Sequence, residues 1–218
     1  MVKVPEDAPL EILGPLGCGI QTGAGAVMNA LRPEPGSSII ISGIGAVGLA
    51  GLLAAKAVGC TTIVALDINQ PRLDLAKELG ATHTINSKTD DVPAKIKEYL
   101  GAGADHAFDT TGRADVMGQI INGLTHLGKC AFVGVGAKPL ELDMISFMTK
   151  GLTLTGVTEG NSVPDVFIPA LVRLYQQGKF PFDKLIKKYP FEQINQAIID
   201  SETGKTIKPV IEIGKYKG

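Results

Sequence analysis

The sequence lacks several features that mark whole classes of protein. It has no tryptophan, only 5% aromatic residues, and a formal net charge of −1 with no basic block. An even charge balance of this kind disfavours sequence-led binding to nucleic acid. The longest apolar run, "VGLAGLLAAKAVG", is interrupted by Lys56 and is too short to cross a bilayer. We therefore expect neither a nucleic-acid-binding protein nor a membrane protein.

Cysteine is also scarce. The three cysteines, Cys18, Cys60 and Cys130, are an odd number and form no C-x-x-C pair. A disulfide framework is therefore disfavoured. The first residues, "MVKVPEDAPLEI", are polar and contain two prolines, unlike a secretory signal. These observations predict a protein of the reducing cytoplasm.

The chain is rich in apolar residues, and they occur in short runs that alternate regularly with helical patterns. Hydrophobic residues make up 44% of its 218 residues, enough for a sizeable core. Short, almost continuously apolar runs alternate with helical patterns, which predicts βαβ units and a doubly wound, six-stranded parallel sheet covered on both faces. The expected strands are 38–42, 62–67, 82–86, 104–110, 129–136 and 152–157, and the expected helices are 46–58, 71–80, 92–100 and 114–124.

The two ends of the chain depart from this alternation. Residues 1–35 read as a helix pair that ends in the proline-rich "RPEPG". Residues 181–218 contain a helix from about 192 to 200 and a last strand, "IKPVIEI". We therefore predict a central domain over 36–180, flanked by two pieces of a second lobe.

A glycine cluster, "GIGAVG", follows the first predicted strand and opens the first predicted helix. Gly43 permits a tight turn, Gly45 lets the backbone approach a pyrophosphate, and Gly48 lets the helix pack closely on the strand. Asp67 ends the second strand, 19 residues after Gly48. Its carboxylate is placed to accept hydrogen bonds from the adenosine ribose and to repel a 2′-phosphate. The pattern predicts a Rossmann domain that binds NAD in preference to NADP.

With the glycine cluster, several segments carry a resemblance to a known family. They include "GPLGCGIQTGAGAV", "LDIN", "KELGATHTIN", "FDTTGR", "GKCAFVGVG" and "IKPVIEI". They are similar to the zinc-dependent medium-chain alcohol dehydrogenases, closest to the aryl or benzyl alcohol branch. The resemblance implies that Cys18 is one of three protein ligands of a catalytic zinc. The family's other two ligands lie in an N-terminal GroES-like lobe that has no counterpart in these 218 residues.

The same resemblance implies a set of cofactor contacts. Some of these contacts involve the glycines and Asp67 described above. For Arg72, a contact with the ribose and a position on a solvated helix face are weighted equally. Lys208 stands where the family often has arginine, so it keeps the charge but loses the bidentate fork. The implied cofactor-binding residues are Thr22, Gly43, Gly45, Ala46, Val47, Gly48, Asp67, Ile68, Arg72, Thr110, Arg113, Val133, Val135 and Lys208.

Three functions remain open on this sequence. The resemblance implies NAD-dependent hydride transfer from an aromatic or allylic alcohol with zinc as Lewis acid, but we expect the chain alone to be inactive and to hold no zinc. A standalone, non-catalytic NAD-binding module is the second. A zinc-free quinone oxidoreductase is the third, although such a site has no need of Cys18. We also expect a homo-oligomer, joined at the last parallel strand and by unpaired apolar faces of residues 10–31 and of "PVIEI" near the end of the chain.

Overall fold

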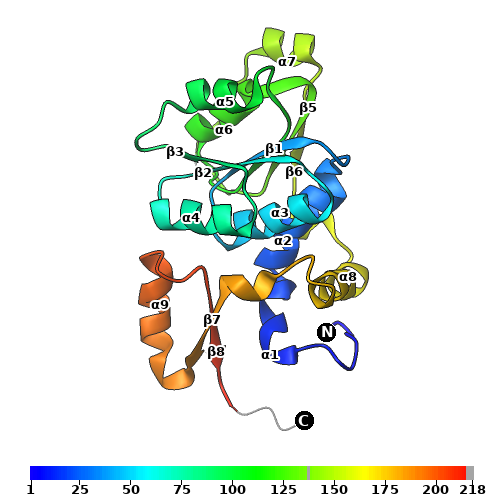
Figure 1. Ribbon diagram of the computed structural model, residues 1–218, viewed down its shortest axis with the longest axis vertical. Helices are drawn as coiled ribbons and strands as arrows, with labels where there is room; N and C mark the ends of the chain where they lie inside the picture. The colour runs from blue at the N-terminus through cyan, green and yellow to red at the C-terminus, as the bar shows by residue number, and fades with distance from the viewer. Residues whose placement is uncertain (137, 215–218) are drawn as a thin grey trace.

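A six-stranded parallel sheet forms the centre of the molecule (Figure 1). The computed structural model describes residues 1–136 and 138–214. The strand order is β3-β2-β1-β4-β5-β6, which confirms the predicted doubly wound sheet. The central strands are buried on both faces, as their continuous apolar runs require. The strands are β1 (Ser38–Ser42), β2 (Thr62–Asp67), β3 (His83–Asn86), β4 (Ala104–Asp109), β5 (Leu124–Phe132) and β6 (Thr153–Gly156).

Helices cover the two faces of the sheet. Figure 1 shows α3 (Ala46–Ala57) and α4 (Gln70–Leu79) below it and α5 (Val92–Leu100) and α6 (Ala114–Asn122) above it. Each face has its own apolar cluster, so the sheet separates two halves of one core. The short helix α7 (Met144–Lys150) precedes the edge strand β6.

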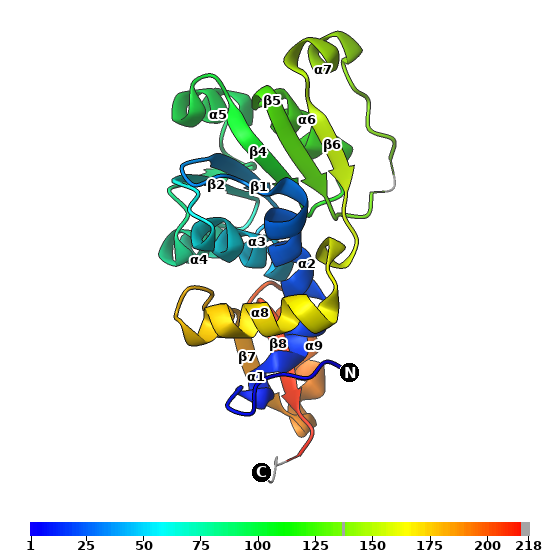
Figure 2. The ribbon, with the colours of Figure 1, turned by 90° about the vertical axis from the view of Figure 1, so that its right-hand side faces the viewer.

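The last part of the chain forms a second, smaller unit. Its two strands, β7 (Ile186–Pro190) and β8 (Lys208–Glu212), pair in parallel and are joined through α9 (Ile194–Glu202). Helix α8 (Pro164–Gln176) lies below the sheet and packs beside the N-terminal helical segment (Figure 2). The connecting turns are η3 (Glu159–Asn161), η4 (Phe182–Leu185) and η5 (Phe191–Gln193).

The N-terminal segment belongs to the core. It consists of α1 (Leu10–Leu13), η1 (Gly14–Gly17), α2 (Gly19–Gly25) and the π-helical turn η2 (Ala26–Leu31). Leu16, Ile20 and Ala24 are fully buried and pack in the same cluster as the lower face of the sheet. The expectation that residues 10–31 leave an unpaired apolar face is therefore wrong. Close packing of α2 on α3 covers that face: a side chain at Gly23 would collide with the Val47 carbonyl.

Two other expectations also need correction. The predicted helix 114–124 ends at Asn122, and Leu124 begins β5, which therefore starts earlier than the predicted strand 129–136 and ends at Phe132. The pairing of β4 with β5 has an irregularity in this stretch, where Leu127 has φ 60°. The sequence reading also assigned no helix to α7 or α8. Pro169 inside α8 interrupts the pattern by which a helix is recognised.

Candidate functional site

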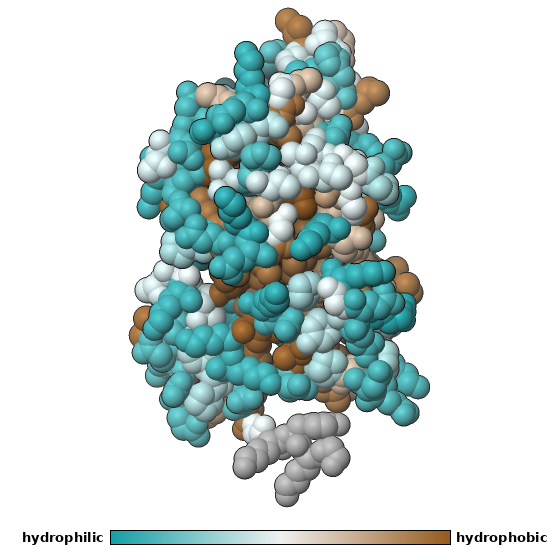
Figure 3. Space-filling view, viewed as in Figure 1, coloured by the Kyte–Doolittle hydropathy of each residue, from teal (hydrophilic) through white to brown (hydrophobic). Residues whose placement is uncertain are grey.

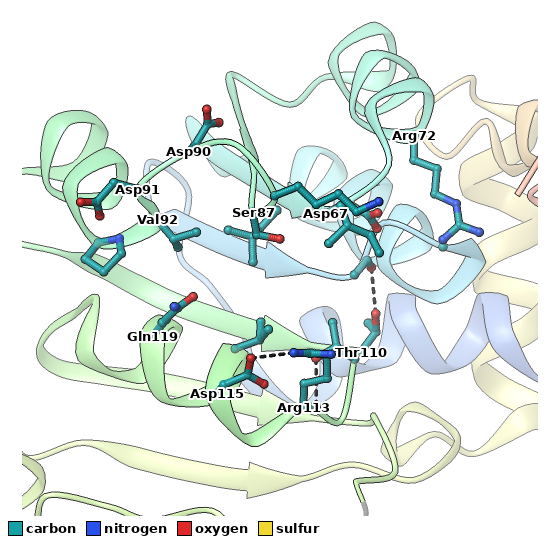
Figure 4. A pocket seen from close by; sticks show the side chains of 18 residues that line it. Asp67, Arg72, Ser87, Asp90, Asp91, Val92, Thr110, Arg113, Asp115 and Gln119 are labelled. Carbon is teal, nitrogen blue, oxygen red and sulfur yellow. Dashed lines mark hydrogen bonds and ion pairs between the residues drawn. The ribbon is translucent and has the colours of Figure 1, made fainter.

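A cavity of about 860 Å³ opens at the carboxyl ends of the parallel strands. This is where doubly wound sheets bind ligands, because the strand order reverses there. Seven predicted cofactor residues line it: Gly43, Gly45, Asp67, Ile68, Arg72, Thr110 and Arg113. The sequence reading missed the following lining residues: Leu66, Ser87, Lys88, Asp90, Asp91, Val92, Pro93, Thr111, Asp115, Val116 and Gln119. Figure 4 shows most of these side chains facing a common space between β2 and the start of α6.

The glycine turn is shaped as its sequence predicts. Gly43 has φ 83°, a conformation that disfavours other residues, and a side chain there would collide with Thr110. A side chain at Gly48 would collide with the Gly43 carbonyl, so this glycine allows the helix to pack on the turn. Nothing lies within 4 Å of the position of a Cβ at Gly45. Helix α3 begins directly afterwards, and no side chain of residues 1–136 or 138–214 caps its first N–H groups, which can therefore bind an anion.

The Asp67 carboxylate is fixed by the backbone. Its side chain is buried, with Oδ2 accepting the Ile44 N–H at 2.6 Å and Oδ1 accepting the Asn69 N–H at 2.8 Å. The first contact ties the acid to the glycine turn, and the second ties it to the start of α4. Each oxygen retains a further acceptor position. The carboxylate can therefore receive two hydroxyl groups without moving.

A second buried acid, Asp109, joins two walls of the cavity. It ends β4 and is fully buried, and it accepts hydrogen bonds from Ser42 Oγ at 2.6 Å, Thr111 Oγ1 at 2.8 Å and the Gly112 N–H at 2.9 Å. Thr110 Oγ1 donates to the Gly43 carbonyl at 2.8 Å. The glycine turn and the turn after β4 therefore form one hydrogen-bonded unit. Asp109 lies in register with Ser42 in the neighbouring strand, a pairing that only the folded sheet brings together.

The two arginines of the cavity are held differently. Arg113 forms an exposed ion pair with Asp115 at 2.7 Å, and its hydrogen bond lowers the pKa of that carboxyl. Arg72 lies in the first turn of α4, beside the end of the cavity that holds Asp67 (Figure 4). Within residues 1–136 and 138–214 its side chain has no hydrogen bond or ion pair, and its Nε is buried.

Comparison with known proteins identifies the family. Residues 46–177 match the family described as zinc-binding dehydrogenase. The chain belongs to that family. A geraniol dehydrogenase of Castellaniella defragrans is 46% identical over 96% of this chain and 57% of its own length. A benzyl alcohol dehydrogenase structure from Acinetobacter calcoaceticus has a TM-score of 0.95 and is 53% identical, over 98% of this chain and 59% of the other.

The alignment covers nearly all of this chain but only part of each relative. A zinc-binding-domain alcohol dehydrogenase structure from Burkholderia ambifaria, with a TM-score of 0.95 and 51% identity, is covered over 58% of its length. The chain thus spans a little under three fifths of these proteins. It carries the NAD-binding domain of the zinc-binding dehydrogenase family, whose members use NAD(P). No helix among the described residues is long and apolar enough to cross a membrane.

Several residues implied by the family resemblance do not line the cavity. Ala46, Val47 and Gly48 form the first turn of α3 behind the glycine turn. Thr22 is half-buried in α2, and its N–H donates to the Cys18 carbonyl. Beyond β5, Val133 packs on the core, whereas Val135 is fully exposed. Lys208 begins β8 in the second unit.

Cys18, the residue implied as a zinc ligand, is exposed at the start of α2. Its Sγ lies 3.9 Å from Glu159 Oε1, and Gln21 Nε2 donates to the other oxygen of that carboxylate at 3.1 Å. Glu159 and Asn161 both have left-handed backbones, so this turn after β6 is strained. Among the residues that the structure describes, no group of three His, Cys, Asp or Glu side chains could hold a metal. The described residues do not complete a zinc site.

Proposed function

We propose that this chain binds NAD(H) in preference to NADP(H) and that the cavity at the strand ends is the cofactor site. The observation that carries the proposal is the buried Asp67 carboxylate, which is fixed between the glycine turn and α4. Each of its oxygens can accept one more hydrogen bond. A 2′-phosphate placed there would meet a fixed negative charge that cannot turn away. A ribose with two free hydroxyls would instead find a preformed acceptor.

The pyrophosphate would lie at the free N–H groups where α3 begins, and the adenine between Ile68 and the turn from Thr110 to Arg113. The remaining implied contacts, Thr22, Val133, Val135 and Lys208, would then face the nicotinamide or the pyrophosphate. Lys208 and Thr22 lie in elements outside the central sheet. If Thr22 and Lys208 contact the cofactor, the cofactor must extend from the cavity to the elements below the sheet.

The proposed reaction of the longer protein is hydride transfer between an alcohol and NAD. The names of two relatives, a geraniol and a benzyl alcohol dehydrogenase, favour an allylic or aromatic alcohol. Zinc in such an enzyme supplies a Lewis acid that stabilises the alkoxide. Cys18 would contribute one ligand, and its exposed thiol favours this function over that of a zinc-free quinone oxidoreductase.

For the 218 residues alone we propose a cytoplasmic cofactor-binding module without turnover. A catalytic zinc site needs three protein ligands, and Cys18 supplies one. The test is calorimetric titration of the purified chain with NADH and with NADPH, with zinc measured after dialysis against a chelator and oxidation of benzyl alcohol assayed separately. Tighter binding of NADH supports the proposal, and equal affinity for both cofactors contradicts it. Stoichiometric retained zinc or turnover of about 1 s⁻¹ or faster contradicts the proposed inactivity.

A further inference from the structure

The position of Arg72 in its helix is unusual. Arg72 is the third residue of α4, and a cation in the first turn of a helix meets the positive end of the helix dipole. The Arg72 Nε and the Asn69 Oδ1 are both enclosed, and neither has a hydrogen-bond partner within the described part of the chain. Neither the helix nor a polar partner therefore holds the guanidinium. Its conformation must be set by packing.

The packing partner comes from the second unit. Gly204 lies between α9 and β8, with φ 75°. A Cβ built at Gly204 would stand 3.1 Å from Asn69 Nδ2 and 3.2 Å from Arg72 Nη2. Those separations are shorter than ordinary van der Waals contact, so a Cβ at this position would displace the two side-chain ends by a few tenths of an ångström. Gly204 therefore forms the surface on which the guanidinium rests.

Hydrogen bonds to α9 hold the backbone around Gly204 in place. The Gly204 N–H donates to the Ser201 carbonyl at 3.1 Å, and the Thr206 N–H donates to the Asp200 carbonyl at 2.9 Å. The Asp200 carboxylate is itself buried and accepts the Tyr189 hydroxyl at 2.7 Å. The turn that holds Gly204 is thus anchored at both ends to α9 and through Tyr189 to β7.

We propose that Gly204 is a positioning residue of the cofactor site. Because Gly204 has no side chain, the Arg72 guanidinium can pack on its backbone and lie beside Asp67. The small C-terminal unit thereby determines the position at which Arg72 would contact the cofactor ribose. The proposal rests on the proposed function, because Arg72 must contact the cofactor for its seat to matter. It also makes cofactor binding and the order of the 203–206 turn reciprocally coupled.

The test compares two glycines that have the same backbone strain. Gly178 has φ 70° and nothing within 4 Å of a built Cβ, so Gly178→Ala introduces the strain without touching Arg72. We expect Gly204→Ala to weaken NADH binding about fivefold or more, and Gly178→Ala to change the Kd less than about twofold. In an Arg72→Met background, Gly204→Ala should have no further effect on the Kd, because the seated group is gone. Equal effects of the two glycine variants would overturn the proposal.

If Gly204→Ala does not fold, amide hydrogen exchange in the unmutated chain tests the proposal instead. Saturating NADH should slow exchange of the Gly204 and Thr206 amides, with the Gly178 amide, which donates to Tyr175, as the reference. Exchange that NADH leaves unchanged at all three amides would overturn the proposal. Failure of the proposed function would look different, because the unmutated chain would then not bind NADH at all.

Discussion

The Asp67 carboxylate accepts two backbone N–H groups, and we propose that it also accepts the hydroxyls of the cofactor ribose. We expect Asp67→Ala to weaken NAD binding about tenfold or more, since a hydrogen bond to a charged group contributes about 1.5–3 kcal/mol. The affinity for NADP should fall much less, because the repelling charge is removed together with the acceptor. Calorimetry with both cofactors measures this.

The matched control for that variant is Asp74→Ala, which removes an exposed carboxylate from the same helix, α4. It should leave both affinities unchanged. An unaltered ratio of NAD to NADP affinity in Asp67→Ala would show that the buried charge does not set the cofactor preference.

Thiol reactivity should single out Cys18. Burial raises the pKa of Cys60 to about 11, and burial also raises the pKa of Cys130, so neither forms much thiolate near neutral pH. Cys18 is exposed. Alkylation of the native chain at pH 8, followed by mass spectrometry, should therefore add one label, and Cys18→Ser should abolish it. Labelling of Cys60 or Cys130 at a comparable rate would contradict this assignment.

At the scale of elements, the sequence predicted what depends on local pattern. Helix α5 has the predicted bounds, because Asp91 caps it and Gly101 ends it. The glycine turn precedes α3 and Asp67 ends β2, as predicted, because the ends of these elements follow from local sequence pattern. Asp109 and Gly204 could not be assigned in the same way. Their roles come from contacts with Ser42 and Arg72, which are distant in sequence and adjacent only in the folded chain.

The C-terminal unit should lose stability in acid through one residue. The Tyr189 hydroxyl and the Gln196 amide donate to Asp200, and Lys187 and Lys205 lie 3.4 and 3.6 Å from its carboxylate oxygens. The hydrogen bond from Tyr189, followed by these other contacts, lowers the pKa of Asp200 to about 2. Because the unfolded value is about 3.9, this contribution to stability is present above about pH 4 and is lost as the pH falls through about 2.

Comparison with Asp200→Asn isolates that contribution. Urea unfolding midpoints of the two proteins should differ by a constant amount from pH 7 to about pH 4, and the difference should shrink between about pH 4 and 2. Glu202→Gln, an exposed change at the end of the same helix, should show no such pH-dependent difference. A difference that persists unchanged to pH 2 would mean that Asp200 ionisation does not stabilise the unit.

At the scale of the whole molecule, the surface reflects the partial match to its relatives. Apolar side chains gather along the waist between the six-stranded sheet and the C-terminal unit (Figure 3). Several large apolar residues of that unit are also exposed: Phe191, Ile194, Ile198, Ile199 and Ile213. Exposed apolar groups in such number are typical of a surface that another segment or chain covers. The relatives extend well beyond the length matched here, so their additional residues are one candidate cover.

Self-association is expected at a different place, the open edge of the sheet. Strand β6 is the last strand of the sheet, so one side of its backbone has no neighbouring strand within the described chain. Helix α7, which leads into β6, exposes Met144, Ile145 and Met148. Two copies related by a two-fold axis could pair their β6 edges and cover both helices.

Light scattering at tens of micromolar should therefore give a mass above that of one chain. Thr153→Lys places a charge on the exposed face of β6 and should shift the mass toward the monomer, as natural edge strands use lysine to block pairing. The matched control is Thr84→Lys on β3, the opposite edge of the same sheet, which should leave the mass unchanged. A monomeric unmutated chain would contradict self-association, and equal dissociation by both variants would show that pairing does not use β6.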